Sequence, residues 1–286
     1  MLLQIGGHTV SVEGGCAERF LSQYNGAKPF IVGDAEPEWK IRFGIDISDE
    51  RATVLSDFVF SEINADCIFS CNGDAYYFKI YEKGAPEHLV SMMYRSGSDC
   101  VEATVCHNPS ALRFAIWFAY SMLSAQVGTT FVHSSVIVYK ERAILFLGES
   151  GTGKSTHTRL WLNDISGTHL LNDDSPVLSV EDGTPYVYGS MWSGKTPCYV
   201  ARRFPLSAVV RLSQAPKNEI RSLSIPEAFA ALQPSLPPAL MQDERFADML
   251  VGIISDTISV VPSFRLGCLP NADAARLSCK TVFGSL

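Results

Sequence analysis

The sequence predicts an α/β fold, in which a mixed sheet with helices is preceded by a β-rich N-terminal part. Short β-rich runs separated by turn residues fill the first 107 positions. From residue 108 onward, apolar strands alternate with helical patterns, and a glycine-rich loop stands between a strand and a helix start. We therefore expect a β-rich domain or layer over residues 1–107 and an α/β domain over residues 108–286.

Composition and charge exclude several classes of protein. Of the 286 residues, 47% are hydrophobic and 19% are charged, which is typical of a soluble globular chain. The formal charge of −7 argues against a nucleic-acid partner, because an acidic surface repels phosphate backbones. Residues 1–10 lack the basic flank and cleavage site of a targeting segment, and the most apolar stretch, 111–127, is shorter than a membrane span. We expect a cytoplasmic protein with no membrane contact.

The N-terminal part is predicted to be a small antiparallel β layer followed by a buried helix. Turn signals such as Asn72-Gly73-Asp74 separate β-rich runs at 2–5, 39–47, 53–63, 75–81, 88–94 and 100–105. Asn108 is a plausible helix N-cap with Pro109 at the first helical position, and a helix of about 17 residues follows. Its apolar side chains run nearly all round, so we expect it to be buried.

The C-terminal part is predicted to alternate strands and helices. Strands are expected at 131–139, 143–147, 168–171, 177–180, 186–188, 206–212 and 263–268. Helices are expected from 155 to 162, from a capping box at Ser224 and Glu227 to just before Pro234, over 243–260, and from Asp273 onward.

The glycine-rich loop after the strand at 143–147 fits the pattern G-x-x-x-x-G-K-[ST] at every required position. Its residues are Gly148, Glu149, Ser150, Gly151, Thr152, Gly153, Lys154 and Ser155. The glycines let backbone N–H groups cradle phosphate oxygens, and the helix that follows favours anions at its N-terminus. Lys154 would neutralise the β- and γ-phosphates, and the Ser155 hydroxyl would bind Mg²⁺. These residues and the adjoining Thr156 form the expected site for a nucleoside triphosphate with Mg²⁺.

Two further features accompany the loop. Asp173 and Asp174 end an apolar run one helix after the loop, where α/β proteins keep their ligands. The alternative is a solvated turn before Pro176. His133 lies in the strand that precedes the loop strand, and on its own a histidine there is more often a hydrogen-bonded core residue.

Together these residues resemble the catalytic domain of HPr kinase/phosphorylase, within the phosphoenolpyruvate-carboxykinase-like group. The resemblance rests on His133-Ser134-Ser135, on the glycine-rich loop and on Leu171-Asn172-Asp173-Asp174. It implies a carboxykinase-like mixed sheet with a P-loop, ATP rather than GTP, and transfer of phosphate to a serine hydroxyl. It also implies that His133 positions the reacting groups, that one aspartate is the base, and that the other binds Mg²⁺. We assign the metal to Ser155 and Asp174, while the resemblance leaves open which aspartate is the base and which the metal ligand. Members of the family are often homo-oligomers.

The chain departs from that family at residues 189–197. The family's glycine-rich stretch with a magnesium-binding glutamate is absent in recognisable form, and Trp192-Ser193-Gly194-Lys195 stands there instead. Lys195 would clamp a phosphate or the acceptor, or else belong to a surface loop with a packed tryptophan. Arg202 and Arg203 read as solvated basic residues, and His157 as a surface residue.

The sequence thus predicts an ATP- and Mg²⁺-dependent phosphotransferase with an unknown hydroxyl acceptor on a protein, peptide or small molecule. Two alternatives stay open. One is a nucleotide-responsive binding module with little or no turnover, and the other is a carboxykinase-like metabolic enzyme.

Overall fold

The chain forms two compact units. The computed structural model describes residues 1–48, 52–84, 87–194 and 196–284. Unit 1 comprises residues 1–127 and 238–248, and unit 2 comprises residues 128–237 and 249–286. The boundary was expected between residues 107 and 108, before the helix at Pro109–Ala125. In the structure the division falls after that helix, between residues 127 and 128.

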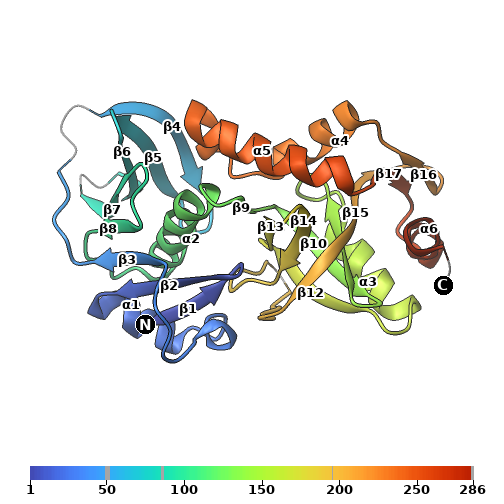
Figure 1. Ribbon diagram of the computed structural model, residues 1–286, viewed down its shortest axis with the longest axis horizontal. Coiled ribbons are helices and arrows are strands. Elements are labelled where there is room, and N and C mark those ends of the chain that lie inside the picture. The colour runs from blue at the N-terminus through green and yellow to red at the C-terminus, as the bar shows by residue number, and fades with distance from the viewer. Residues whose placement is uncertain (49–51, 85–86, 195, 285–286) are drawn as a thin grey trace. The chain divides into compact units, whose positions relative to one another are not determined.

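Unit 1 is a mixed sheet in the order β1-β2-β3-β8-β7-β6-β5-β4, with helices packed on it. Its strands are β1 (Leu2–Ile5), β2 (His8–Glu13), β3 (Trp39–Phe43), β4 (Thr53–Phe60), β5 (Ala65–Asn72), β6 (Ala75–Glu82), β7 (His88–Arg95) and β8 (Cys100–Ala103). Its helices are α1 (Gly15–Gln23), η1 (Lys28–Phe30), α2 (Pro109–Ala125) and η3 (Leu240–Gln242). Figure 1 shows α2 lying against the sheet.

The expectation of an antiparallel layer was wrong for part of this sheet. β3 pairs in parallel with both β2 and β8, whereas the pairs from β4 to β8 are antiparallel. The sequence reading also missed α1, β2 and β5. The helix predicted from Pro109 is confirmed, because the Asn108 side chain accepts from the backbone N–H groups of Ser110 and Ala111.

Aromatic packing explains why α2 and residues 238–248 belong to unit 1. Phe118 of α2 stacks on Phe78 of β6, with ring centroids 3.8 Å apart. From the later segment, Phe246 meets the Tyr76 ring edge to face at 5.0 Å, and the Tyr76 hydroxyl donates to Asp243 at 3.0 Å. Aromatic pairs of this kind stabilise a core beyond the area they bury.

Unit 2 is an α/β fold built on a mixed sheet. Its strand order is β12-β10-β11-β15-β14-β13-β9, and β15 also pairs with β17, which pairs with β16. The strands are β9 (Thr129–Phe131), β10 (Ser134–Tyr139), β11 (Arg142–Leu147), β12 (His169–Asp174), β13 (Val177–Glu181), β14 (Thr184–Tyr188), β15 (Arg203–Gln214), β16 (Glu219–Ser222) and β17 (Ser263–Cys268). The helices are α3 (Lys154–Asp164), α4 (Ile225–Leu232), η2 (Gln233–Ser235), α5 (Glu244–Val260) and α6 (Ala272–Phe283), and α5 begins within unit 1.

Strands β11, β15 and β17 run parallel, whereas β10 is antiparallel to both β11 and β12. The last residues of β11 and β12 and the first residues of β10 therefore meet at one edge of the sheet. That edge carries the glycine-rich loop, the paired aspartates and His133. Loops at the carboxyl ends of parallel strands are where α/β proteins place their ligands.

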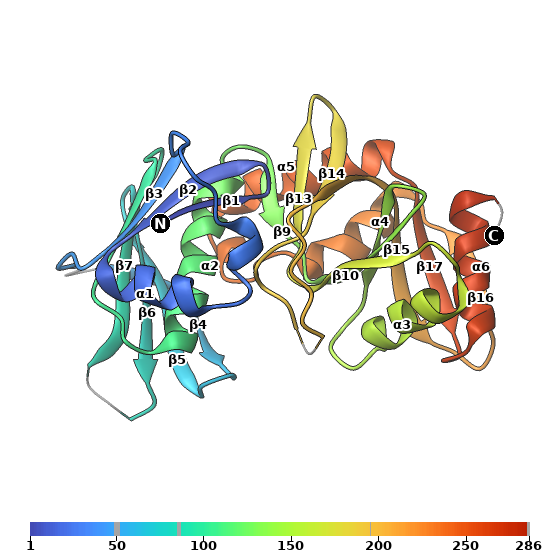
Figure 2. The ribbon, with the colours of Figure 1, turned by 90° about the horizontal axis from the view of Figure 1, so that it is seen from below.

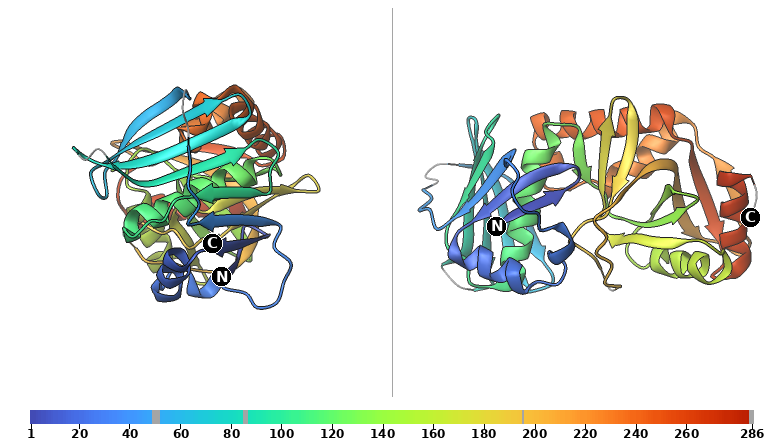
Figure 3. Two further views of the ribbon diagram at one scale, coloured as in Figure 1. Left: turned by 90° about the vertical axis from the view of Figure 1, so that its left-hand side faces the viewer. Right: turned by 60° about the horizontal axis from the view of Figure 1, so that its bottom comes forward.

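Helices cover both faces of this sheet. Figures 1 and 2 show α3 and α6 on the same side, and the right-hand view of Figure 3 shows α4 on the other side. On the first side Trp161 of α3 and Cys279 of α6 pack with Phe146, Val210 and Leu266 from three strands. α4 begins with the predicted capping box of Ser224 and Glu227.

Two predicted strands in unit 2 differ from the structure. The strand expected over residues 131–139 is two strands, and Val132 and His133 lie between β9 and β10. β12 does not stop before its polar residues, because Asn172, Asp173 and Asp174 are its last three members. Ser135 and Asp173 are direct cross-strand partners, and the β10–β12 register is irregular between Val136 and Ile137. Such irregularities are common beside active sites.

The helices in the described part of the chain are too short or too polar to cross a membrane.

Candidate functional site

The glycine-rich loop between β11 and α3 leaves the first turn of α3 available to a ligand. Gly151 and Gly153 take left-handed backbone angles, with φ of 81° and 108°, which glycine adopts without steric cost. Gly153 is the N-cap of α3 and has no side chain to bond the free N–H groups. Thr152 tightens the turn, since its backbone N–H and its hydroxyl both donate to the Glu149 carbonyl oxygen, at 3.1 Å and 2.7 Å. Free N–H groups at a helix N-terminus attract anions.

Lys154 lies folded over the loop. Its ammonium Nζ donates to the Gly148 carbonyl oxygen at 2.7 Å and lies 3.0 Å from His133 Nε2. Burial lowers the pKa of Lys154 below its ordinary value, while the carboxylates of Asp174 and Asp173 oppose that shift. The loop therefore places the Lys154 side chain at the point where phosphate oxygens would enter.

His133 links the lysine to one of the aspartates. Its backbone N–H donates to the Ser235 carbonyl oxygen at 2.7 Å, which fixes the short segment between β9 and β10. Its Nδ1 lies 3.5 Å from Asp174 Oδ1. Because an ammonium group only donates, the contact with Lys154 leaves the lone pair on Nε2 and assigns the proton of a neutral imidazole to Nδ1, facing Asp174. His133 was predicted to lie within a strand, but it lies in the short segment between β9 and β10.

Asp173 is buried and is held by hydroxyl groups. It is 5% exposed, and its Oδ1 accepts from Ser155 Oγ at 3.1 Å and from Ser135 Oγ in a shorter contact. A hydroxyl and a carboxylate together are the oxygen donors that Mg²⁺ prefers, with water and phosphate completing the shell. These two residues therefore fit a magnesium ion. The sequence reading had paired Ser155 with Asp174.

Asp174 is the more open of the two carboxylates. Its side chain is 38% exposed, and Oδ2 accepts from Ser175 Oγ at 2.9 Å. With Oδ1 facing His133, the carboxylate stands at the mouth of the site. A base that meets an incoming hydroxyl must be accessible in this way.

A pocket of about 380 Å³ contains these groups. We call it the acid pocket. Its walls include His133, Ser135, Glu149, Ser150, Gly151, Gly153, Lys154, Ser155, Thr156, Asp173, Asp174 and Gly194. The structure thus brings the predicted catalytic residues, apart from Lys195, to one place. Lys195 lies outside the described residues.

Asn172 is a positioning residue that sequence reasoning missed. It is fully buried, and its amide donates to the Trp192 carbonyl oxygen at 3.0 Å and to Ser190 Oγ at 3.2 Å. Its Oδ1 accepts from the backbone N–H groups of Asp174 and Ser175, both at 3.0 Å. Asn172 therefore ties the end of β12 to the segment at 190–192. The available signal was an amide directly before an acid pair.

The segment at 189–194 packs closely on β12. The Gly194 backbone N–H donates to the Asp173 carbonyl oxygen at 3.0 Å, and a Cβ at Gly194 would lie only 2.6 Å from that oxygen. Trp192 is buried and meets the Phe131 ring edge to face at 5.1 Å. Gly194 is required because its backbone lies so close to the Asp173 carbonyl oxygen. Trp192 is a packing residue.

The two arginines after this segment bond elsewhere on unit 2. Arg202 donates to Glu141 at 3.0 Å, and Arg203 donates to the Tyr188 hydroxyl at 2.9 Å. A different arginine, Arg211 of β15, lies 3.6 Å from Glu149 in the loop. Sequence reasoning missed Arg211, although a charge inside the apolar run 206–212 was a visible signal.

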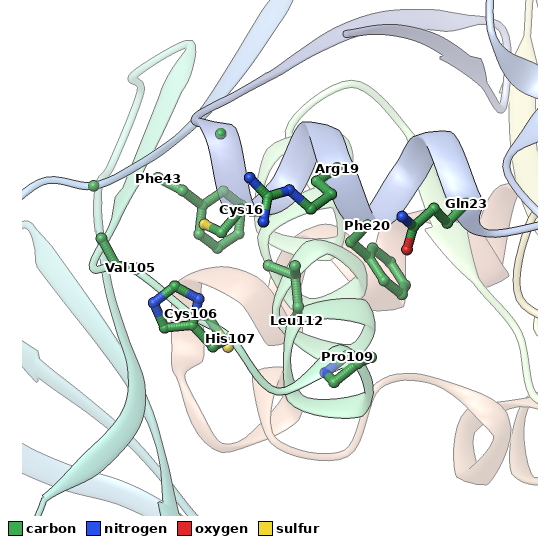
Figure 4. Close-up of a pocket in the computed structure, with 12 residues that line it drawn as sticks. Cys16, Arg19, Phe20, Gln23, Phe43, Val105, Cys106, His107, Pro109 and Leu112 are labelled. Atoms are coloured by element: carbon green, nitrogen blue, oxygen red, sulfur yellow. The ribbon is translucent and has the colours of Figure 1, made fainter.

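Unit 1 has a pocket of its own. Figure 4 shows Cys16 and Arg19 of α1 on one side of it and Cys106 and His107 on the other. The pocket has a volume of about 330 Å³. Burial raises the pKa of Cys106 to about 11, so its thiol stays protonated at neutral pH. A protonated thiol is a poor nucleophile, so Cys106 is not suited to nucleophilic catalysis.

Comparison with known proteins does not assign this chain to a family. No family model matches the chain, and a search of curated proteins finds no match. Among solved structures, the HPr(Ser) kinase/phosphatase from Coxiella burnetii is similar over 53% of this chain and 92% of that chain, at 14% identity and a TM-score of 0.30. A similarity with that TM-score carries no argument about function.

Proposed function

We propose that this chain is an ATP- and Mg²⁺-dependent phosphotransferase that moves the terminal phosphate to a hydroxyl acceptor. The observation that carries the proposal is the acid pocket, where Lys154 and Ser155 of the glycine-rich loop face two aspartates that differ in exposure. Phosphoryl transfer needs positioning and charge neutralisation, together with a group that accepts the hydroxyl proton. Each requirement has a residue in this pocket.

The loop, Lys154 and the N-terminus of α3 bind the phosphates. Ser155 and Asp173 hold Mg²⁺, which neutralises charge on the β- and γ-phosphates when bound. This assignment replaces Asp174 by Asp173 as the metal ligand. It follows from the 3.1 Å contact between Ser155 and Asp173 and from the burial of Asp173.

Asp174 is the base, and His133 orients it. The acceptor oxygen forms a new bond to the γ-phosphorus, the bond from that phosphorus to the bridging oxygen of ADP breaks, and the hydroxyl proton passes to Asp174. His133 Nδ1 lies 3.5 Å from Asp174 Oδ1 and so can orient the carboxylate. Asp173 is less suited to this role because two hydroxyl groups already occupy its Oδ1.

We further infer that unit 2 has the carboxykinase-like sheet with a P-loop. An antiparallel strand, β10, separates the loop strand β11 from the acid strand β12. An all-parallel doubly wound sheet would have a parallel strand there. The motif resemblance supports a serine hydroxyl on a protein, peptide or small molecule as the acceptor.

Mg²⁺-dependent release of ADP from ATP by the purified chain tests the proposal. Lys154→Ala and Asp174→Asn are each expected to lower the turnover rate by about 100-fold or more, since one removes phosphate neutralisation and the other the base. Lys280→Ala on α6 and Asp182→Asn in the β13–β14 turn are the matched controls, and both should retain the parent rate.

The binding-module alternative predicts a different result. ATP binding that Lys154→Ala abolishes, with no turnover by the parent against any hydroxyl acceptor, would replace the enzyme by a nucleotide-responsive module. Turnover that is unaffected in Asp174→Asn would remove Asp174 from the mechanism.

A further inference from the structure

A second pocket adjoins the glycine-rich loop on the side away from the paired aspartates. It has a volume of about 380 Å³ and lies between the start of α3 and the ends of β15 and β17. In the sheet, β10 and β12 lie on one side of the loop strand β11, and β15 and β17 lie on the other. The two pockets therefore open on opposite flanks of one loop.

The two pockets share part of the loop as a wall. Gly151, Gly153 and Thr156 contribute to the walls of both. A ligand whose phosphates occupy the acid pocket can thus extend past Thr156 into the second pocket. A nucleotide has this shape, because its base and sugar are joined to one end of its phosphate chain.

The chemistry of the second pocket suits a flat, largely apolar group. Its apolar walls include Leu160 of α3, Leu269 and Pro270 after β17, and Ala215 after β15. Gln214, the last residue of β15, adds a polar side chain. Sites for small organic ligands combine apolar walls with a few polar groups that fix orientation. The acid pocket, by contrast, is walled by charged and hydroxyl side chains.

His157 is a buried polar residue beside this pocket. It contributes to the wall and is 2% exposed. Trp161 Nε1, which only donates, lies 3.2 Å from His157 Nε2, so the proton of the neutral ring is on Nδ1. Within the described part of the chain, that Nδ1 has no hydrogen-bond partner. A buried donor without a partner destabilises the folded chain.

We infer that this second pocket binds the base and ribose of the nucleoside triphosphate whose phosphates enter the acid pocket. The inference rests on the proposed function. It adds a binding site for the base and ribose, which a phosphate-binding loop does not contact. It assigns nucleoside recognition to Leu160 of α3 and to Leu269 and Pro270, which follow β17.

Binding of ATP, GTP and inorganic tripolyphosphate, each with Mg²⁺, is to be compared by calorimetry. The preferred nucleotide should bind about tenfold or more tightly than tripolyphosphate, since only the nucleotide fills the second pocket. Leu269→Ala should weaken nucleotide binding about fivefold and leave tripolyphosphate binding unchanged. Leu162→Ala is the matched control, because that leucine has a similar exposure, 40% against 38%, and should change neither affinity.

The outcomes separate the two proposals. If neither nucleotide exceeds tripolyphosphate in affinity, or if Leu269→Ala weakens both ligands equally, the second pocket is not the nucleoside site while the phosphate site stands. If tripolyphosphate and both nucleotides fail to bind the parent, the proposed function itself is wrong. Retained tripolyphosphate binding by Leu269→Ala also demonstrates that the variant is folded.

Discussion

At the scale of residues, the two neighbouring aspartates have different environments. Asp173 points to Ser135 and Ser155 and is buried, whereas Asp174 faces His133 and is partly exposed. A buried carboxylate needs compensating partners, and hydroxyl groups alone compensate a charge less well than a cation does. These two environments support the proposal that Asp173 holds the metal and that Asp174 acts as the base.

Ser135→Ala should raise the Mg²⁺ concentration needed for half-maximal nucleotide binding by about tenfold, because it removes one of the hydroxyl groups that hold Asp173. Ser134→Ala is the control. Ser134 is equally buried, but its hydroxyl donates to the Val132 carbonyl oxygen. Identical Mg²⁺ titrations of the two variants would show that Ser135 does not position the carboxylate.

At the scale of elements, the site depends on how closely the segment at 189–194 lies against β12. Asn172 and the Gly194 backbone hold the two together. The break between β9 and β10 is the other such feature, since it lets His133 leave the sheet and reach Lys154. Neither feature belongs to a regular helix or strand, and both carry residues toward the acid pocket.

Gly194→Ala should lower the turnover rate about tenfold or more, because its Cβ would come within 2.6 Å of the Asp173 carbonyl oxygen and the backbone must move. Gly252→Ala on α5 is the matched substitution. A Cβ there meets open space, so that variant should keep its activity and gain about 0.5–1 kcal/mol in free energy of unfolding. Parent-like turnover by Gly194→Ala would contradict the role given to this close approach.

At the scale of the whole molecule, a buried histidine in the core under α3 makes the free energy of unfolding depend on pH. His157 was expected at the surface, but it is buried between Phe146, Trp161 and Ser278. Burial lowers its pKa to about 4, against an ordinary value of 6.5. The unfolded chain therefore binds a proton between these two pH values while the folded chain does not, and stability must fall as the pH drops through that range.

Denaturant unfolding of the parent and of His157→Gln at pH 7.5, 5.5 and 4.5 measures this cost. The histidine should account for a loss of up to about 3 kcal/mol between pH 6.5 and 4, and the variant should have a correspondingly flatter profile. His107→Gln, at an exposed position of unit 1, should leave the profile as in the parent. Parallel profiles for the parent and His157→Gln would rule out this account.

The division into units was also decided at this scale. The boundary expected before Pro109 followed a change in local pattern. In the structure α2 packs by Phe118 on β6, and Phe246, far along the chain, joins the same core. Local pattern cannot reveal which sheet a buried helix will cover, because an apolar helix fits any apolar face of suitable shape.

Local chemistry in the sequence was enough to predict the features that depend on neighbouring residues. The Asn108 cap, the capping box at Ser224 and the α/β alternation follow from short-range backbone bonding and side-chain periodicity, and the glycine-rich loop follows from a contiguous motif. Only the tertiary structure decided which aspartate meets Ser155 and where His133 and His157 lie. Those contacts depend on strand register and on packing between residues distant in the chain, for which no local pattern carries the information.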